Sequence, residues 1–149
     1  FDVDDANVLA SVADASVDYA FGNGVLHHLE LERFGPALAA KLVPGGRARF
    51  VEPAQGNLLL RTFRRLTPQL RTPDEHPFDD DAIRSLQRYF DVRVTYHALV
   101  RPYLPMLLAN HRLAVRAAKW LDDRLLKAPM MQGQAWLLQI ELCKRKTQA

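Results

Sequence analysis

The sequence predicts one α/β domain built on a largely parallel sheet. Short apolar runs typical of strands alternate along the chain with segments of helical periodicity, and glycine, proline or aspartate bounds most of these segments. The length of 149 residues suits a single domain with a sizeable core. The final strand follows a long helical connection, so we expect it to return antiparallel to its neighbours.

The first half of the chain contains two predicted strands and two predicted helices. Residues 17–22, VDYAFG, form a mostly apolar run that ends in glycine, as expected of a buried parallel strand. Residues 31–42 place apolar side chains at helical spacing, and residues 47–52 form the next strand. A second helix is expected to follow Asn57, which is a good N-cap residue.

The second half contains the clearest helix and two further strands. Residues 79–90 begin with three aspartates, where the helix dipole favours negative charge. Residues 92–98 alternate apolar and polar side chains, as does the final segment, residues 134–145. Between these two strands, residues 102–130 are predicted to be a helical insertion within the single domain of residues 1–149.

The insertion carries an amphipathic helical pattern over residues 104–127. The predicted inward face and the opposite basic face are Ala114, Ala117, Leu121 and Leu125 against Arg112, Arg116 and Lys119. The ordinary interpretation is a solvated basic face over a packed apolar stripe. The alternative is a peripheral contact with a membrane surface.

Composition excludes several classes of protein. The net charge of +3 is mild, and no strongly basic block interleaved with aromatic residues indicates nucleic-acid binding. The single cysteine, Cys143, cannot form an internal disulfide and favours a reducing, cytoplasmic location. No uncharged stretch reaches the length of a membrane-spanning helix, so stable membrane insertion is not expected.

Three segments in order resemble a known family. They are residues 5–29, DANVLASVADASVDYAFGNGVLHHL, residues 42–53, LVPGGRARFVEP, and residues 71–78, RTPDEHPF. Together they resemble the later part of a class I S-adenosylmethionine-dependent methyltransferase of the methyltransferase type 11 kind. The family's earlier glycine-rich turn has no counterpart, because all seven glycines lie at or after Gly22. The resemblance therefore implies a Rossmann-like sheet that is truncated at its N-terminus.

The resemblance also implies the cofactor, S-adenosylmethionine, and the residues that bind it. Asp5 would accept a hydrogen bond from the adenine amino group, and the amide of Ala6 would face the edge of the ring. The turn of Gly22, Asn23 and Gly24 would lie near the sulfonium end of the cofactor. This placement agrees with the chemistry of glycines at the carboxyl ends of parallel strands.

Acidic and histidine side chains are the remaining site candidates. His27 and His28 are adjacent, so on a helix their side chains should point about 100° apart and not share a metal ion. We expect no metal site, and we expect at least one of the two histidines to line the cleft, where imidazole can act as a base. Glu52 ends a strand, either as a functional carboxylate or as a cap of the next segment. Glu75 and His76 either belong to a lid over the substrate or lie in a solvated loop.

The predicted function is methyl transfer to a small-molecule acceptor, with His27, His28 and Glu52 as catalytic candidates. Glu75 and His76 are the substrate-binding candidates. The alternative is a non-catalytic α/β module derived from a methyltransferase, used for binding or dimerisation. Residues 17–22 would form an exposed apolar edge strand if nothing pairs with them, which favours a homodimer or a longer native chain.

Overall fold

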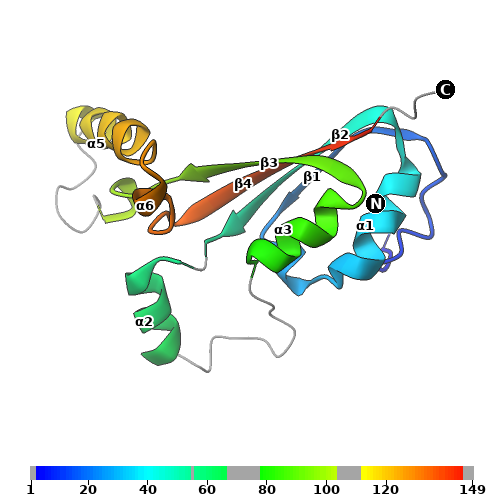
Figure 1. Cartoon of the computed structure of the whole chain (residues 1–149), viewed down its shortest axis with the longest axis horizontal. Coiled ribbons are helices and arrows are strands. Elements are labelled where there is room, and N and C mark those ends of the chain that lie inside the picture. Colours follow the sequence, from blue (N-terminus) through cyan, green and yellow to red (C-terminus); the bar gives the residue numbers. More distant parts are fainter. Residues whose placement is uncertain (1–2, 55, 67–77, 104–111, 146–149) are drawn as a thin grey trace. The chain divides into compact units, whose positions relative to one another are not determined.

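The computed structural model describes residues 3–54, 56–66, 78–103 and 112–145, and it contains a four-stranded sheet in the order β1-β2-β4-β3 (Figure 1). The strands are β1 Val17–Asn23, β2 Leu42–Pro53, β3 Phe90–His97 and β4 Leu137–Lys144. β1 and β2 pair in parallel, and the remaining pairings are antiparallel. The predictions of an α/β fold and of an antiparallel final strand are confirmed.

The helices lie close to the predicted positions. They are η1 Leu26–His28, α1 Leu31–Lys41, α2 Leu58–Leu66, α3 Asp80–Gln87, η3 Arg101–Tyr103, α5 Arg112–Leu125 and α6 Pro129–Gln132. In the part of the chain that the structure describes, η3, α5 and α6 lie between β3 and β4.

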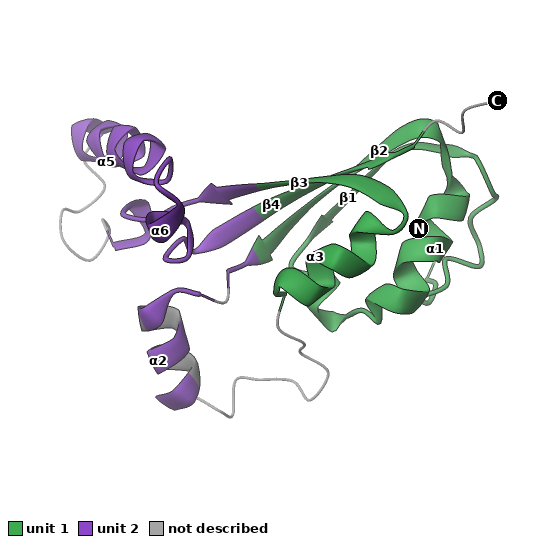
Figure 2. Ribbon diagram, viewed as in Figure 1, with its two compact units in different colours: residues 1–52, 72–94, 139–149 green, residues 53–71, 95–138 purple. Residues whose placement is uncertain are grey.

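Contacts divide the chain into two compact units (Figure 2). Unit 1 comprises residues 1–52, 72–94 and 139–149, which include β1, nearly all of β2, α1 and α3. Unit 2 comprises residues 53–71 and 95–138, which include α2, η3, α5 and α6. The division falls within β3 and β4, so each of these strands contributes to both units.

The core of unit 1 lies on one face of its strands. Ala48, Phe50 and Glu52 alternate with more exposed residues along β2, as the period of a strand requires. Phe34 of α1 packs edge-on against Phe50, with ring centroids 5.8 Å apart. Helices α1 and α3 contact each other on this same face (Figure 1). The apolar face of β2 is thereby removed from water.

β1 forms one edge of the sheet. Tyr19 and Phe21 point to the face away from Phe50, and their residues are 54% and 66% exposed. Residues 17–22 form the predicted parallel strand, but the expectation that it is buried is wrong for the described residues, because β1 lies at an edge and exposes apolar side chains.

Helix α3 begins where its sequence predicts. Asp79 is the N-cap, and its carboxylate accepts hydrogen bonds from the amides of Asp81 and Ala82 at 3.0 and 3.1 Å. These bonds satisfy two of the amides that have no partner within the first turn. Asp80 and Asp81 follow in that turn, where the helix dipole favours them.

Helix α2 begins directly after Asn57, as the sequence predicts, and Gln134 bonds to this start. The amide of Leu58 donates to the side-chain oxygen of Gln134 at 3.1 Å, while the side-chain amide of Asn57 donates to the Gln134 carbonyl at 2.6 Å. Asn57 is 3% exposed, because it is used to join two segments of unit 2 that are distant in sequence.

The predicted inward face of α5 is partly wrong. Ala117 is exposed and Leu121 is 37% exposed, whereas Ala118 and Asp122 are buried. Asp122 is 1% exposed, and its carboxylate accepts hydrogen bonds from the amide of Val100 at 2.6 Å and the Arg101 side chain at 3.0 Å. Because the Asp122 carboxylate is buried with these partners, the face of α5 that points inward differs from the face that apolar periodicity alone predicts.

Among the described residues, no helix combines the length and apolar character needed to cross a membrane.

Candidate functional site

The candidate site lies in unit 1, where the parallel strands β1 and β2 end side by side. Gly22 is in register with Phe50, and Asn23 with Val51, so the turn after β1 adjoins Glu52. The amide of Gly24 donates to the carbonyl of Val51 at 2.8 Å, which continues the pairing into the turn. Ligands in open α/β sheets bind beyond the carboxyl ends of parallel strands.

Glu52 is the central side chain of the site, because it is fully buried and fully bonded. Its Oε1 atom accepts hydrogen bonds from the amides of Val25 and Leu26 at 3.0 and 2.9 Å. Its Oε2 atom lies 2.6 Å from Nδ1 of His27. Glu52 is thus a capping carboxylate, but it caps η1, which lies about 25 residues earlier in the chain, rather than the segment that follows β2.

The bond to Glu52 determines which ring nitrogen of His27 carries the proton in the neutral form. An ionised carboxylate only accepts hydrogen bonds, so Nδ1 must carry the proton that joins it to Oε2. In the neutral ring, Nε2 then has an unshared electron pair. The side chain of His27 is 12% exposed, and it lines a pocket. The arrangement can accept a proton from a neighbouring ligand.

The two histidine rings lie together rather than apart. Their centroids are 4.1 Å apart and their planes are tilted by 41°. The expectation that the side chains diverge is wrong for the rings, because both residues lie on a single short 3₁₀ turn and the rings lean toward each other. No group of three histidine, cysteine, aspartate or glutamate side chains within the described residues is arranged to hold a metal ion.

The two glycines of the turn are required for different physical reasons. A Cβ atom on Gly22 would lie 2.6 Å from a ring carbon of Phe50 and 2.7 Å from Val25, so the position has no room for a side chain. Gly24 has a φ of +61°, in the left-handed region that glycine adopts without strain. Asn23, between them, is exposed.

The turn that carries Asp5 and Ala6 is anchored beside this site. The carbonyl of Asp5 accepts the amides of Val8 and Leu9 at 2.9 Å, and the side-chain oxygen of Asn7 accepts the amide of Glu30 at 2.8 Å. Because Glu30 follows His28 by two residues, this bond ties the turn to the end of η1. The carboxylate of Asp5 is exposed and accepts one amide, that of Asn7.

Asp4 fixes the same turn through Ser11. Its carboxylate accepts the Ser11 amide at 2.7 Å and the Ser11 hydroxyl at 2.8 Å, and these bonds hold the pKa of Asp4 below its ordinary value. A lowered carboxyl pKa means that the stabilising contribution is complete above the ordinary value and is lost as the pH falls through the lowered one. The turn therefore keeps this support at neutral pH.

A pocket of about 290 Å³ adjoins His27. Its lining is mostly apolar, and it also includes Glu30 and the N-cap residue of α3; the full set is Leu26, His27, Leu29, Glu30, Leu31, Phe78, Asp79 and Ala82. The carboxylate of Asp79 is already bonded to the first turn of α3. The predicted substrate residues Glu75 and His76 lie outside the described residues.

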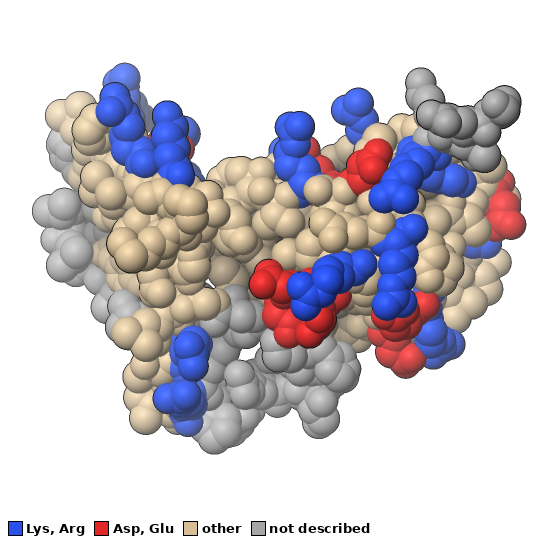
Figure 3. Space-filling view, viewed as in Figure 1, with Lys and Arg blue, Asp and Glu red and all other residues tan. Residues whose placement is uncertain are grey.

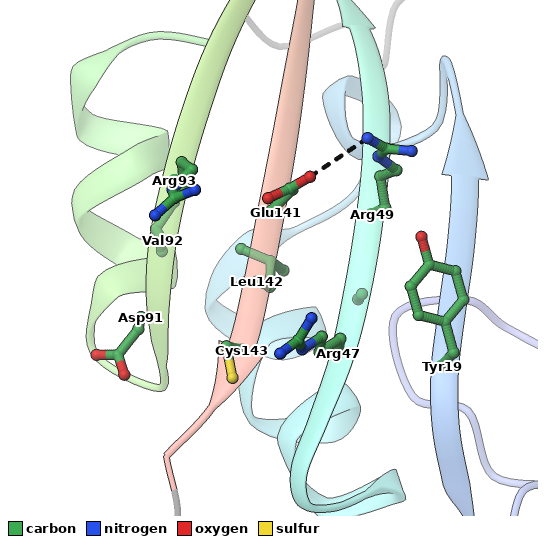
Figure 4. Close-up of a pocket in the computed structure, with 10 residues that line it drawn as sticks. Tyr19, Arg47, Arg49, Asp91, Val92, Arg93, Glu141, Leu142 and Cys143 are labelled. Carbon is green, nitrogen blue, oxygen red and sulfur yellow. Dashed lines mark hydrogen bonds and ion pairs between the residues drawn. The ribbon is translucent and has the colours of Figure 1, made fainter.

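A larger pocket of about 560 Å³ lies on the other face of the sheet in unit 1. Figure 4 shows Arg47, Arg49 and Arg93 on this face, with Arg49 paired to Glu141 at 3.3 Å. The pocket presents cationic groups, and its lining includes neither His27 nor Glu52 nor the Gly22–Gly24 turn. We therefore take the candidate site to lie beside His27, where the carboxylate-bound ring and the Gly22–Gly24 turn meet.

Comparison with known proteins supports the fold through structure alone. No protein-family model matches the chain, and no curated protein matches it. A SAM-dependent methyltransferase from Archaeoglobus fulgidus matches with a TM-score of 0.56 and 16% identity over 95% of this chain and 66% of its own. A Thermotoga maritima SAM-dependent methyltransferase, described as a possible histamine N-methyltransferase, matches with a TM-score of 0.63 and 14% identity over 94% of this chain and 61% of its own.

A phosphoethanolamine N-methyltransferase from Haemonchus contortus, solved with S-adenosyl-L-methionine, matches with a TM-score of 0.58 and 16% identity over 95% of this chain. This chain spans 36% of that protein. The chain therefore has the Rossmann-like fold of class I SAM-dependent methyltransferases, and it spans about two thirds or less of the length of these three structures.

Replacing Gly22 by alanine tests the packing of the turn. The added methyl group collides with the Phe50 ring, so we expect G22A to lower the free energy of unfolding by about 1–3 kcal/mol, as over-packing of a core does. G133A is the matched control, because a Cβ atom there meets nothing within 4 Å. Urea unfolding followed by circular dichroism measures both. Equal stability of G22A and G133A would contradict this packing.

Replacing Glu52 by glutamine tests the orientation of His27. Glutamine keeps an oxygen for the amides of Val25 and Leu26 but presents an NH₂ group to Nδ1, so the neutral ring must shift its proton to Nε2. Long-range ¹H–¹⁵N NMR of the imidazole distinguishes the two tautomers. We expect Nδ1–H in the wild type and Nε2–H in E52Q. The same tautomer in both proteins would show that Glu52 does not orient the ring.

Proposed function

We propose that this chain is part of an enzyme that transfers a methyl group from S-adenosylmethionine to a small-molecule acceptor. The observation that carries the proposal is the pairing of His27 with the buried carboxylate of Glu52, beside the Gly22–Gly24 turn, in a methyltransferase fold. The structures that share this fold include one solved with S-adenosyl-L-methionine.

The residues beside the site fit such a cofactor. Asp5 presents an exposed carboxylate whose second oxygen can accept a hydrogen bond from an exocyclic amine. Ala6 contributes a backbone amide on the same turn, while Gly22, Asn23 and Gly24 would lie near the sulfonium end of the cofactor. The cofactor, when bound there, supplies an electrophilic methyl group.

His27 would act on the acceptor. Its Nε2 atom can take the proton that an alcohol, phenol or ammonium group must lose to become a nucleophile. Glu52 touches no ligand in this scheme, because it is buried and its oxygens are already bonded. It is therefore a positioning residue. It holds the His27 ring and stabilises the imidazolium that forms when the ring takes the proton. His28 lies against His27, and it stays a predicted catalytic residue.

The pocket beside His27 supports the choice of acceptor class. Leu26, Leu29, Leu31 and Phe78 make its lining mostly apolar, so it suits a small organic molecule that presents one nucleophilic atom to the imidazole. We keep Glu75 and His76 as predicted contacts of that molecule. Alignment of the nucleophile with the methyl group would supply much of the rate, since methyl transfer gains from proximity.

The alternative is a binding or dimerisation module that has the fold without the activity. The exposed side chains of Tyr19 and Phe21 on edge strand β1 favour it, because such an edge can pair with a second copy. The two functions differ in whether the turn after β1 responds to the cofactor.

NMR titration with S-adenosylhomocysteine distinguishes them. We expect the amides of Ala6, Asn23 and Gly24 to shift in ¹H–¹⁵N spectra as the ligand is added, and the shift at Ala6 to be reduced in D5N, which removes the acceptor charge. D91N is the control, because it removes another exposed carboxylate of unit 1, which pairs with Arg145. Unchanged chemical shifts of these amides up to the ligand's solubility limit would contradict the proposal and favour the binding or dimerisation module.

A further inference from the structure

Helix α5 carries an exposed stripe of apolar and cationic side chains on the surface of unit 2. Leu113 is 66% exposed and Trp120 is 59% exposed. Arg116, Ala117 and Arg124 are also exposed and lie three or four residues from these two, so all five share one side of the helix. We call Leu113, Arg116, Ala117, Trp120 and Arg124 the outer stripe.

Positive charge dominates the outside of α5. The exposed cations are Arg112, Arg116, Lys119 and Arg124, and Figure 3 shows basic side chains gathered over this helix. Asp122 is turned inward and paired with Arg101, so its charge does not oppose them. Asp123 is the one outward acidic side chain of α5, and it pairs with Lys119, which keeps its pKa below the ordinary value.

Trp120 is the unusual member of the stripe. The guanidinium group of Arg124 lies over its ring, 5.1 Å from the centroid, so the cation and the aromatic surface are presented together. A tryptophan this exposed leaves a large apolar area in water. Its amphipathic ring is suited to the boundary between lipid headgroups and acyl chains, and arginine is suited to lipid phosphates.

We propose that the outer stripe of α5 docks unit 2 on a bilayer that contains anionic phospholipid. The helix would lie in the plane of the interface, with Leu113 and Trp120 entering the headgroup region and the arginines contacting phosphates. Charge complementarity selects the occupant: an apolar protein groove would leave Arg116 and Arg124 unpaired, whereas an anionic bilayer satisfies both parts of the stripe. This inference is independent of methyl transfer.

Flotation with lipid vesicles provides the first test. The full chain is mixed with vesicles of phosphatidylcholine alone, or of phosphatidylcholine with phosphatidylglycerol, and separated on a density gradient. We expect the chain to float with the anionic vesicles and to remain largely in the soluble fraction with the neutral ones. Equal partitioning onto both, or onto neither, would overturn the proposal.

Paired variants test which surface binds. R116Q/R124Q should lower the partition coefficient at least about tenfold, since each surface cation contributes to attraction by anionic lipid. R47Q/R93Q removes the same net charge from unit 1 and should leave partitioning within about twofold. An equal loss in both double variants would show a general charge effect and contradict docking by α5.

Tryptophan fluorescence tests insertion directly, because the chain has two tryptophans. W136F leaves Trp120 as the reporter, and its emission should move to shorter wavelength and be quenched by brominated lipid. W120F retains Trp136, which is partly buried and bonded to Tyr103, and should show neither change. Flotation without a blue shift or quenching of Trp120 would show that the stripe does not enter the headgroup region, and it would overturn the proposal.

Discussion

The structure of the candidate site depends on one buried carboxylate, that of Glu52. An ionised group with no exposed surface is stable only when hydrogen bonds replace its hydration. Glu52 obtains them from Val25, Leu26 and the His27 ring, and each such donor would cost about 1–3 kcal/mol if it were left buried without a partner. The same three bonds hold the turn after β1 against the end of β2. The hydrogen bonds of Glu52 therefore both stabilise the turn after β1 and orient the His27 ring.

Unit 2 has its own buried carboxylate, and it has a comparable effect on a surface. Asp122 turns inward to bind the amide of Val100 and the side chain of Arg101. Because Trp120 lies two residues earlier on the same helix, it is directed outward. Burial of one charge thus exposes an aromatic ring with Arg124 over it. In each unit, a buried carboxylate, that of Glu52 or Asp122, orients the candidate functional residues.

Local patterns in the sequence predict much of the fold, but not these long-range pairs. The helix start at the three aspartates and the strand at residues 17–22 depend on neighbours within a few residues, and both are confirmed. The partners of Glu52 lie 25–27 residues away, so a cap of the following segment was an equally good prediction. The inward face of α5 could not be predicted by hydrophobic periodicity, which assigns an aspartate outward and Leu121 inward. The bond between the Asn57 side chain and the Gln134 carbonyl could not be predicted for the same reason, since the two residues are distant in sequence.

The most direct measurement is amide hydrogen exchange at Val25 and Leu26 in the wild-type chain. Apart from Glu52, these amides have no hydrogen-bond partner in the described residues, and they belong to a short turn that would otherwise exchange quickly. If the buried carboxylate organises the site, both amides exchange at least about a hundredfold more slowly than unstructured peptide, with protection close to that of the β2 core. Exchange at the rate of an open loop would show that Glu52 does not hold the turn, and the account of His27 as an oriented base would fail with it.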